Sequence, residues 1–144
     1  MSIQQISVFL ENKPGRLQQM TQLLAEHNID LRALSLAETK DFGIARMITD
    51  DAYETANVLR DGSYIANFSP VLAFAVPDEP GGLAKLLSAF NDAKVNIEYM
   101  YAFLGSRESK HAYMIFRVTH TKDSEAALTA RGLEPLTLED ITNA

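Results

Sequence analysis

Two short stretches, ENKPGRL at 11–17 and PDEPGGL at 77–83, share a pattern that decides how the chain is interpreted. We call them the first corner and the second corner. Each follows an apolar run, and its Pro-Gly precedes a leucine and a helical pattern. Proline suits the first turn of a helix because its missing N–H has no partner there. Glycine costs up to about 1 kcal/mol in a helix, so its presence predicts close approach to the backbone or an unusual backbone angle.

The two corners belong to an internal repeat that extends along most of the chain. At one constant offset the copies pair Pro14 with Pro80, Gly15 with Gly81, Leu17 with Leu83, Met20 with Leu86, Leu24 with Phe90, Ile29 with Val95, Asp30 with Asn96 and Leu31 with Ile97. After a longer loop in the second copy the offset increases, and the pairing continues as far as Gly62 with Gly132. The sequence predicts a duplicated unit, with domains at 1–69 and 70–144 and a very short junction at Ser69-Pro70.

Both copies show the same order of hydrophobic patterns. Alternating or continuous apolar runs predict strands at 4–11, 28–38, 43–49 and 63–68, and again at 70–77, 95–105, 111–119 and 133–138. Helical spacing predicts helices at 15–27, 51–61, 83–93 and 122–131, with Gly62 and Gly132 as left-handed residues at helix ends. The order βαββαβ, twice, predicts an α+β fold of two ferredoxin-like domains, each an antiparallel sheet with helices on one face.

Composition argues against several kinds of protein. The chain of 144 residues carries a net charge of -6 and no Lys/Arg run, which argues against binding to nucleic acid or to anionic membranes. Cysteine is absent, so disulfides, thiolate metal sites and cysteine nucleophiles are excluded. Neither a secretory signal nor a membrane-spanning segment is recognisable, and a cytoplasmic protein is expected.

The sequence offers little support for catalysis. His111 and His120 would lie at opposite ends of one predicted strand, and His27 would lie on or at the end of a helix, so a shared metal ion is not expected. Acidic pairs at 50–51 and 78–79 precede helices, where their charge favours the helix dipole. No nucleophile-elbow, phosphate-loop or dinucleotide-binding motif is present. We expect no catalytic residue, no metal and no cofactor.

The stretches NKPGRLQQMTQLLAEHNIDL at 12–31 and DEPGGLAKLLSAFNDAKVNIEYM at 78–100 resemble the opening of an ACT domain. That opening has N/D-x-P-G-x-L, a helix, and an N-I-D-like start of the second strand. The resemblance extends over both copies, essentially the whole chain. It implies a small-molecule sensor, usually for amino acids, whose domains pair side by side. In such pairs the ligand lies between the corner of one domain and the second strand of its neighbour.

Carried over by position, the resemblance implies a ligand site built from both corners and from the starts of the second strands. Backbone N–H groups near Gly15 and Gly81 would receive a carboxylate, and Asn12 and Asp78 would orient the ligand. The implied ligand-binding residues are Asn12, Pro14, Gly15, Arg16, Leu17, Ile29, Asp30 and Leu31, and in the second copy Asp78, Pro80, Gly81, Gly82, Leu83, Asn96, Ile97 and Glu98. Gly81-Gly82 leaves more room than Gly15-Arg16, so the second corner is expected to be the better site.

The resulting hypothesis is a non-catalytic regulatory protein that binds an amino acid or a similar small carboxylate, forms a homodimer and signals to an enzyme or a repressor. A protein-interaction scaffold without ligand and an unrecognised ferredoxin-like enzyme remain alternatives. Tyr99, Tyr101 and Phe103 alternate on one strand, either as packing or an interface or as a wall of the ligand site. The polar loop at 105–111 is either a lid or an ordinary hairpin.

Overall fold

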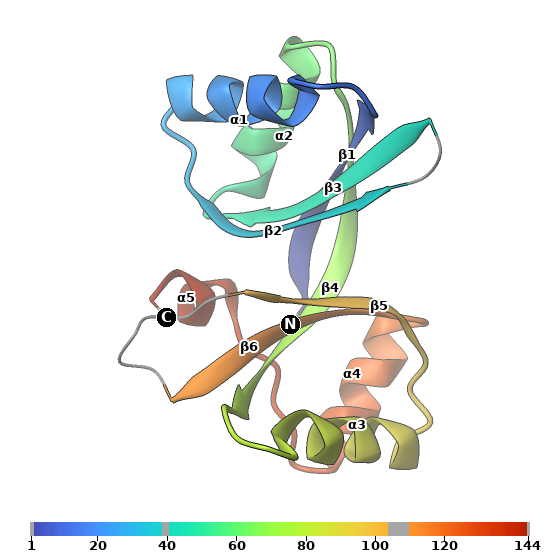
Figure 1. Ribbon diagram of the computed structural model, residues 1–144. Helices are drawn as coiled ribbons and strands as arrows, with labels where there is room; N and C mark the ends of the chain where they lie inside the picture. Colours follow the sequence, from blue (N-terminus) through green and yellow to red (C-terminus); the bar gives the residue numbers. More distant parts are fainter. Residues whose placement is uncertain (1, 39–40, 104–109, 144) are drawn as a thin grey trace. The chain divides into compact units, whose positions relative to one another are not determined.

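The computed structural model describes residues 2–38, 41–103 and 110–143, and the chain divides into two compact units. The first unit comprises residues 4–69, and the second comprises residues 1–3 and 70–144. Each unit has its own hydrophobic core, with two helices packed on one face of its strands (Figure 1). None of the helices in the described part of the chain is long and apolar enough to span a membrane.

The first unit contains β1 (Ile3–Glu11) except its first residue, α1 (Arg16–Glu26), β2 (Leu31–Glu38), β3 (Phe42–Thr49), α2 (Ala52–Asp61) and the beginning of β4 (Ile65–Pro77). Its strands lie in the order β2-β3-β1-β4, and β3 pairs antiparallel with both β1 and β2. Alternate side chains of β1, namely Ile6, Val8 and Leu10, form the core together with Met20 and Leu24 of α1. The two-residue period of a strand and the 3.6-residue period of a helix thus bury one face of each element.

The second unit contains the rest of β4, then α3 (Gly82–Asp92), β5 (Ile97–Phe103), β6 (His111–Val118), α4 (Thr121–Ala130) and α5 (Leu138–Thr142). β6 lies between β4 and β5 and pairs antiparallel with both. Three rings lie in its core, with the centroid of Phe90 4.7 Å from that of Phe116 and 5.5 Å from that of Phe74. The element order confirms the predicted α+β class with two ferredoxin-like repeats.

The strand that joins the two copies differs from the prediction. The sequence predicts two strands with a junction at Ser69-Pro70, but the structure has one strand of 13 residues, Ile65–Pro77. Proline lacks the N–H that a strand ladder uses, yet its carbonyl still accepts a hydrogen bond. Here the Pro70 oxygen accepts from Nη1 of Arg117 at 2.9 Å. The carbonyl of Pro70 thus has a partner, and β4 continues through the proline.

The predicted last strand, at 133–138, does not form. Residues 133–137 are irregular, and a backbone hydrogen bond from the Leu136 N–H to the Ala73 oxygen, 2.7 Å long, joins them to β4. Pro135 removes one of the donors that a full ladder would need. The short helix α5 follows instead, and Thr137 opens it with a capping box.

The two glycines expected to end helices in the left-handed region behave differently. Gly132 has φ 86°, as predicted. Gly62 has φ -82°, and the left-handed residue is its neighbour Ser63, with φ 72°. A Cβ on Gly62 would lie 2.6 Å from a terminal carbon of Leu23, so glycine at this position admits a side chain of α1. The prediction for Gly62 is wrong because its backbone angle is one that any residue adopts, and the left-handed residue is Ser63.

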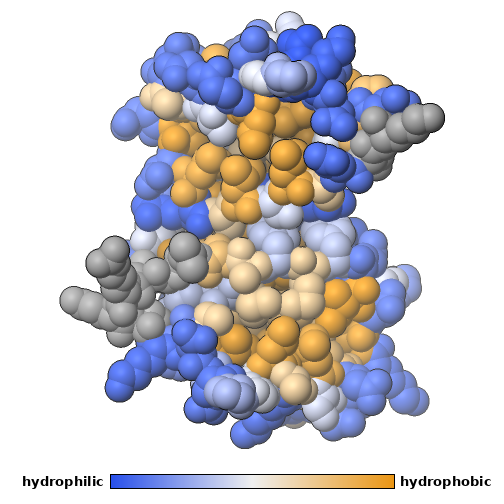
Figure 2. Space-filling model, viewed as in Figure 1, coloured by the Kyte–Doolittle hydropathy of each residue, from blue (hydrophilic) through white to orange (hydrophobic). Residues whose placement is uncertain are grey.

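Large hydrophobic side chains reach the surface of the first unit over the β2–β3 hairpin (Figure 2), where Leu34, Leu36 and Phe42 are exposed. The register places Phe42 opposite Glu11, on the face of β1 that also carries Phe9. This face points away from the helices, because the alternate residues of β1 form the core. Phe9 and Phe42 are therefore placed together by strand register without being part of the helix-covered core.

Candidate functional site

Both corners begin their helices with a glycine in the left-handed region. Gly15 has φ 86° and ψ -10°, and Gly81 has φ 87° and ψ -8°, so the two copies share one backbone conformation. A Cβ on either glycine would meet no atom within 4 Å. The backbone angle, rather than crowding, is the reason for glycine at these two positions. The sequence-based prediction of an unusual angle is confirmed.

The second glycine of the second corner has a different cause. A Cβ on Gly82 would collide with the carbonyl oxygen of Pro77, at the end of β4. Its N–H also donates within the turn, to the Glu79 oxygen at 3.1 Å. The expectation that Gly81-Gly82 leaves more room for a ligand is therefore wrong at Gly82, because backbone already fills that space.

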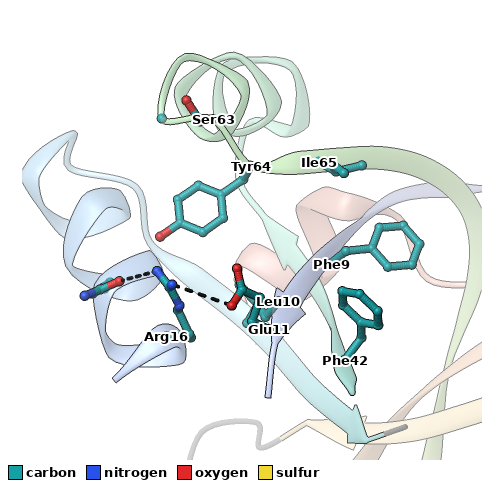
Figure 3. Close-up of a pocket in the computed structure, with 10 residues that line it drawn as sticks. Phe9, Leu10, Glu11, Arg16, Phe42, Ser63, Tyr64 and Ile65 are labelled. Carbon is teal, nitrogen blue, oxygen red and sulfur yellow. Dashed lines mark hydrogen bonds and ion pairs between the residues drawn. The ribbon is translucent and has the colours of Figure 1, made fainter. Parts of the chain in front are cut away.

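A pocket of about 460 Å³ lies beside the first corner, entirely within the first unit (Figure 3), and we call it the first pocket. It is formed by the end of β1, the start of α1, the start of β3, and the turn from α2 into β4. Figure 3 shows the Tyr64 hydroxyl directed toward Arg16 at one end, with Phe9, Phe42 and Ile65 at the other. The full lining is Phe9, Leu10, Glu11, Arg16, Gln19, Phe42, Gly62, Ser63, Tyr64 and Ile65.

A pocket of about 490 Å³ lies beside the second corner, entirely within the second unit, and we call it the second pocket. It is formed by the end of β4, the start of α3 and the segment that follows α4. Both volumes lie in the range of roughly 300–1,000 Å³ that is usual for small-molecule sites. The full lining is Ala75, Val76, Pro77, Glu79, Pro80, Gly81, Gly82, Lys85, Leu86, Ala89 and Leu133.

The two pockets occupy the same place in the repeat. At the offset that matches the corners, the first-pocket residues Phe9, Leu10, Glu11, Arg16 and Gln19 correspond to the second-pocket residues Ala75, Val76, Pro77, Gly82 and Lys85. At the later offset, Gly62-Ser63 corresponds to Gly132-Leu133, of which Leu133 lines the second pocket. Surface hollows that arise by chance have no reason to recur at matched positions. The pocket is thus a property of the duplicated architecture.

The charged groups of the first corner partly neutralise one another. The Glu11 carboxylate lies 2.9 Å from Nζ of Lys13 and 3.7 Å from Nη2 of Arg16. The Arg16 guanidinium also donates to Oε1 of Gln19 at 3.4 Å. Hydrogen bonding and charge from Lys13, followed by the charge of Arg16, lower the pKa of Glu11 below its ordinary value. Glu11 is therefore ionised at neutral pH and has two cations beside it.

The second corner lacks this arrangement. Proline stands at position 77, where the first copy has Glu11, so the acidic partner is missing. Glu79 and Lys85 line the second pocket, and within the described part of the chain neither side chain forms an ion pair or a hydrogen bond. The second pocket thus presents one charge of each sign without an internal partner.

The structure distributes the predicted residues over several hollows. Arg16 lines the first pocket, Pro80, Gly81 and Gly82 line the second, Asn12, Arg16 and Leu17 line a small hollow of about 60 Å³, and Asn96 lines a separate pocket of about 370 Å³. The strand starts at 29–31 and 96–98 lie beyond the far ends of α1 and α3, whose 11 residues each extend about 16 Å. Within one unit, these strand starts therefore lie apart from the corner pocket.

Sequence reasoning misses most of the walls of the first pocket. Strand periodicity gives a signal for Phe9, because it lies on the face of β1 opposite to the core residues, whereas Phe42 precedes the predicted strand at 43–49 and is placed by register. Tyr64 and Ile65 give no comparable signal. They follow α2, and only the folded chain brings them to the first corner.

Three residues for which the sequence suggested packing or helix capping make contacts of that kind. His27 ends α1, and its Nδ1 lies 3.0 Å from a backbone oxygen of that helix. Asp51 caps α2 by accepting from the Glu54 N–H at 3.0 Å. Phe103 stacks on Tyr113 of the neighbouring strand, with centroids 5.1 Å apart.

The remaining sequence-based expectations concern metals and the polar loop. Among the described residues, no group of three His, Cys, Asp or Glu side chains is placed to hold a metal ion. Most of the loop at 105–111 lies outside the described residues, so its suggested role as a lid stays a prediction.

Comparison with known proteins identifies the family. Residues 1–143 match the ACT domain pair family. A protein of Bacteroides thetaiotaomicron has a crystal structure that is 35% identical in sequence, covers 100% of this chain and 98% of its own, and superposes with a TM-score of 0.90. The ligand-free regulatory subunit of aspartate kinase from Thermus thermophilus is 19% identical over 92% of each chain, with a TM-score of 0.67. The corresponding subunit from Thermus flavus is 18% identical over 99% of this chain and 94% of its own, with a TM-score of 0.62.

The chain belongs to the ACT domain pair family, which confirms the resemblance found at the two corners. The two Thermus subunits share its fold at low sequence identity. A comparison with curated proteins found no match.

Proposed function

We propose that this chain is a non-catalytic regulatory protein that binds an amino acid, or a similar small carboxylate, in the pockets beside its two corners. One observation carries the proposal: a pocket of small-molecule size recurs at the same position of both repeats. Membership of the ACT domain pair family supports it. The role of the Thermus proteins as regulatory subunits of aspartate kinase supports a regulatory rather than a catalytic function.

The chemistry of both pockets suits a zwitterion. Arg16 and Glu11 line the first pocket, and Lys85 and Glu79 line the second, so each offers one cation and one anion. A free amino acid carries a carboxylate for the cation and an ammonium for the anion, and such charge-assisted hydrogen bonds are the stronger ones in proteins. The proposal retains the strand starts at 29–31 and 96–98 as contacts that an adjacent domain supplies.

The proposed signal is a change in how domains pair. A ligand that binds one arrangement more tightly than another shifts the population toward the first, by as much as the difference in its binding free energy. In this proposal the chain forms a homodimer, and an enzyme or a repressor recognises the liganded arrangement. Light scattering with and without ligand would show the change as a shift in mass or in hydrodynamic radius.

Thermal melting of the full chain against each of the twenty amino acids tests the proposal. A ligand at 100 times its dissociation constant stabilises the folded state by about 2.7 kcal/mol, which raises the melting temperature by several degrees in a chain of this size. If none of the twenty changes the melting temperature, the proposal fails, and an interaction scaffold without ligand becomes the better explanation.

Matched variants locate the binding site. Gln19→Trp and Lys85→Trp place a large ring at equivalent exposed positions of the first and second pockets. Each should remove the ligand-induced shift that arises at its own pocket. Gln18→Trp and Ala84→Trp, one position earlier on the same helices and outside both pockets, serve as controls. Binding that persists when both pockets are filled would refute this location.

A further inference from the structure

The first and second pockets share a frame but differ in their walls. Phe9 corresponds to Ala75 in the second pocket, and Arg16 corresponds to Gly82. Phe9, Phe42 and Ile65, all lining the first pocket, are 43%, 53% and 65% exposed. Large apolar side chains exposed together often mark a binding surface. The apolar part of the first pocket therefore suits a ligand that has an apolar surface of its own.

The opposite end of the first pocket is polar and charged. Arg16 uses Nη2 toward Glu11 and Nη1 toward Gln19, but a guanidinium has five N–H donors in a planar fork. It can accept a further carboxylate while it keeps these contacts, because planar Arg–carboxylate pairing uses two parallel N–H groups. Glu11 can accept hydrogen bonds from an ammonium. The Tyr64 hydroxyl is directed toward Arg16 (Figure 3), where it adds one more polar group.

We infer that the first pocket selects an amino acid with a large apolar side chain. The carboxylate lies at Arg16 and the ammonium at Glu11, and the side chain covers Phe9, Phe42 and Ile65. This inference rests on the proposed function, and it adds a ligand class and assigns that class to one of the two pockets. The second pocket, with Ala75 where the first has Phe9, lacks this aromatic wall.

The charges distinguish a small zwitterion from a second copy of the chain as the occupant. A partner protein covering the apolar side chains would remove water from the paired charges of Glu11 and Arg16, and that desolvation is costly unless new charged partners compensate for it. A free amino acid supplies one charge for each. The volume of about 460 Å³ also suits a small molecule.

Isothermal titration of the full chain with L-leucine, L-phenylalanine, L-alanine and glycine tests the inference. L-leucine or L-phenylalanine should bind about tenfold or more tightly than L-alanine and glycine, because each methylene buried in an apolar pocket adds roughly tenfold or more. Arg16→Gln should weaken binding of the large amino acids by about tenfold to hundredfold, since it removes charge-assisted hydrogen bonds. Phe42→Ala and Phe9→Ala should reduce the preference for large over small side chains.

Two controls separate specific effects from general ones. Leu34→Ala removes an exposed hydrophobic side chain of β2 that lies outside the pocket, and Lys122→Gln removes an exposed cation of α4. Both should leave the affinities unchanged. Melting temperatures measured for all variants show that each is folded under the conditions of the titration.

The possible outcomes distinguish this inference from the proposed function. If none of the twenty amino acids binds, the proposed function fails and the inference fails with it. If amino acids bind but L-alanine or glycine binds as well as L-leucine and L-phenylalanine, only the inference is overturned. Binding of large amino acids that Arg16→Gln leaves intact also overturns it. The inference is also overturned if Phe42→Ala dissociates a dimer of the chain but does not change ligand binding.

Discussion

Glycine has two separate causes at the second corner. Gly81 is required by its left-handed backbone angle, and so is Gly15 at the first corner. Gly82 is required because the end of β4 approaches it, and Arg16 stands at the equivalent position of the first corner. The same position therefore tolerates a long side chain in one copy and no side chain in the other. Glycine in the sequence alone does not distinguish the two causes.

Alanine should destabilise the protein at one of these equivalent positions and have little effect at the other. Gly82→Ala should destabilise the protein by about 1–3 kcal/mol, because the new Cβ overpacks against the Pro77 carbonyl. Arg16→Ala should change stability by no more than about 0.5 kcal/mol, since a Cβ is already present there. Urea denaturation of both variants measures the difference. Helix propensity alone favours alanine over glycine, so a stabilised Gly82→Ala variant would contradict the proposed contact.

The corner helices and α2 begin differently. The corner helices α1 and α3 begin at a left-handed glycine, and their described starts carry no side-chain cap. The helix α2 begins at Asp51, whose carboxylate accepts a hydrogen bond from the Glu54 N–H. The two residues of the acidic pair at 50–51 have different partners: Asp51 caps α2, and Asp50 accepts a hydrogen bond from Nε of Arg32 at 2.8 Å. At the starts of α1 and α3 the N–H groups of Arg16 and Gly82 donate to backbone oxygens of the corners, whereas the start of α2 uses a side chain for its Glu54 N–H.

Replacing the α2 cap should measurably weaken the first unit. Asp51→Ala should cost about 1 kcal/mol of stability, because it leaves a first-turn N–H without a partner. Asp51→Asn should lose little, since asparagine caps about as well as aspartate. Chemical denaturation gives both values. Equal losses in the two variants would indicate that the charge of Asp51, and not its hydrogen bond, stabilises the helix.

At the scale of the whole molecule, the chain forms two hydrophobic cores, and one strand contributes residues to both units. Met20 and Leu24 of α1 lie in the core of the first unit, and Phe90 of α3 lies between the rings of the second. The strand β4, Ile65–Pro77, contributes to both units without a break. Leu24 and Phe90 are equivalent in the repeat, and their side chains are 1% and 1% exposed. Each of these two equivalent side chains is thus buried in the core of its own unit.

Removing these equivalent side chains tests the division into domains. Leu24→Ala should destabilise by about 2–5 kcal/mol and Phe90→Ala by about 3–5 kcal/mol, from lost burial and the cavity left behind. Hydrogen exchange should show reduced protection mainly in residues 4–69 for the first variant and mainly in 70–143 for the second. Loss of protection spread evenly over both units in either variant would argue against the predicted domains at 1–69 and 70–144.

Local sequence patterns predicted most helices and strands correctly, but they failed at some places. Apolar spacing located the ends of α1 to α4 to within one residue, because one face of each helix must be buried wherever the helix lies. The same patterns failed at 133–138, where apolar content suggested a strand but Pro135 and a following helix cap favour another structure. They also failed at Gly62, because the left-handed residue at the end of α2 is its neighbour Ser63.

The candidate site was predictable only in part. The corners themselves follow from Pro14-Gly15 and Pro80-Gly81 in the sequence. The walls do not, because Tyr64 and Ile65 reach the first pocket from the far end of α2, and strand register decides that Phe42 lies near Phe9. Pairing between strands depends on contacts over long sequence separations, which a local period does not encode.

The sequence by itself determined the duplication, the order of elements and the left-handed glycines at Gly15 and Gly81, since these depend on residues close together in the chain. Only the tertiary structure decided that β4 runs through Ser69-Pro70, that Gly82 lies against Pro77, and which side chains surround each pocket. These features depend on the distance between chain segments after folding. The spacing of apolar residues specifies which face of a helix or strand is buried. The folded structure decides which side chains of other elements that face packs against.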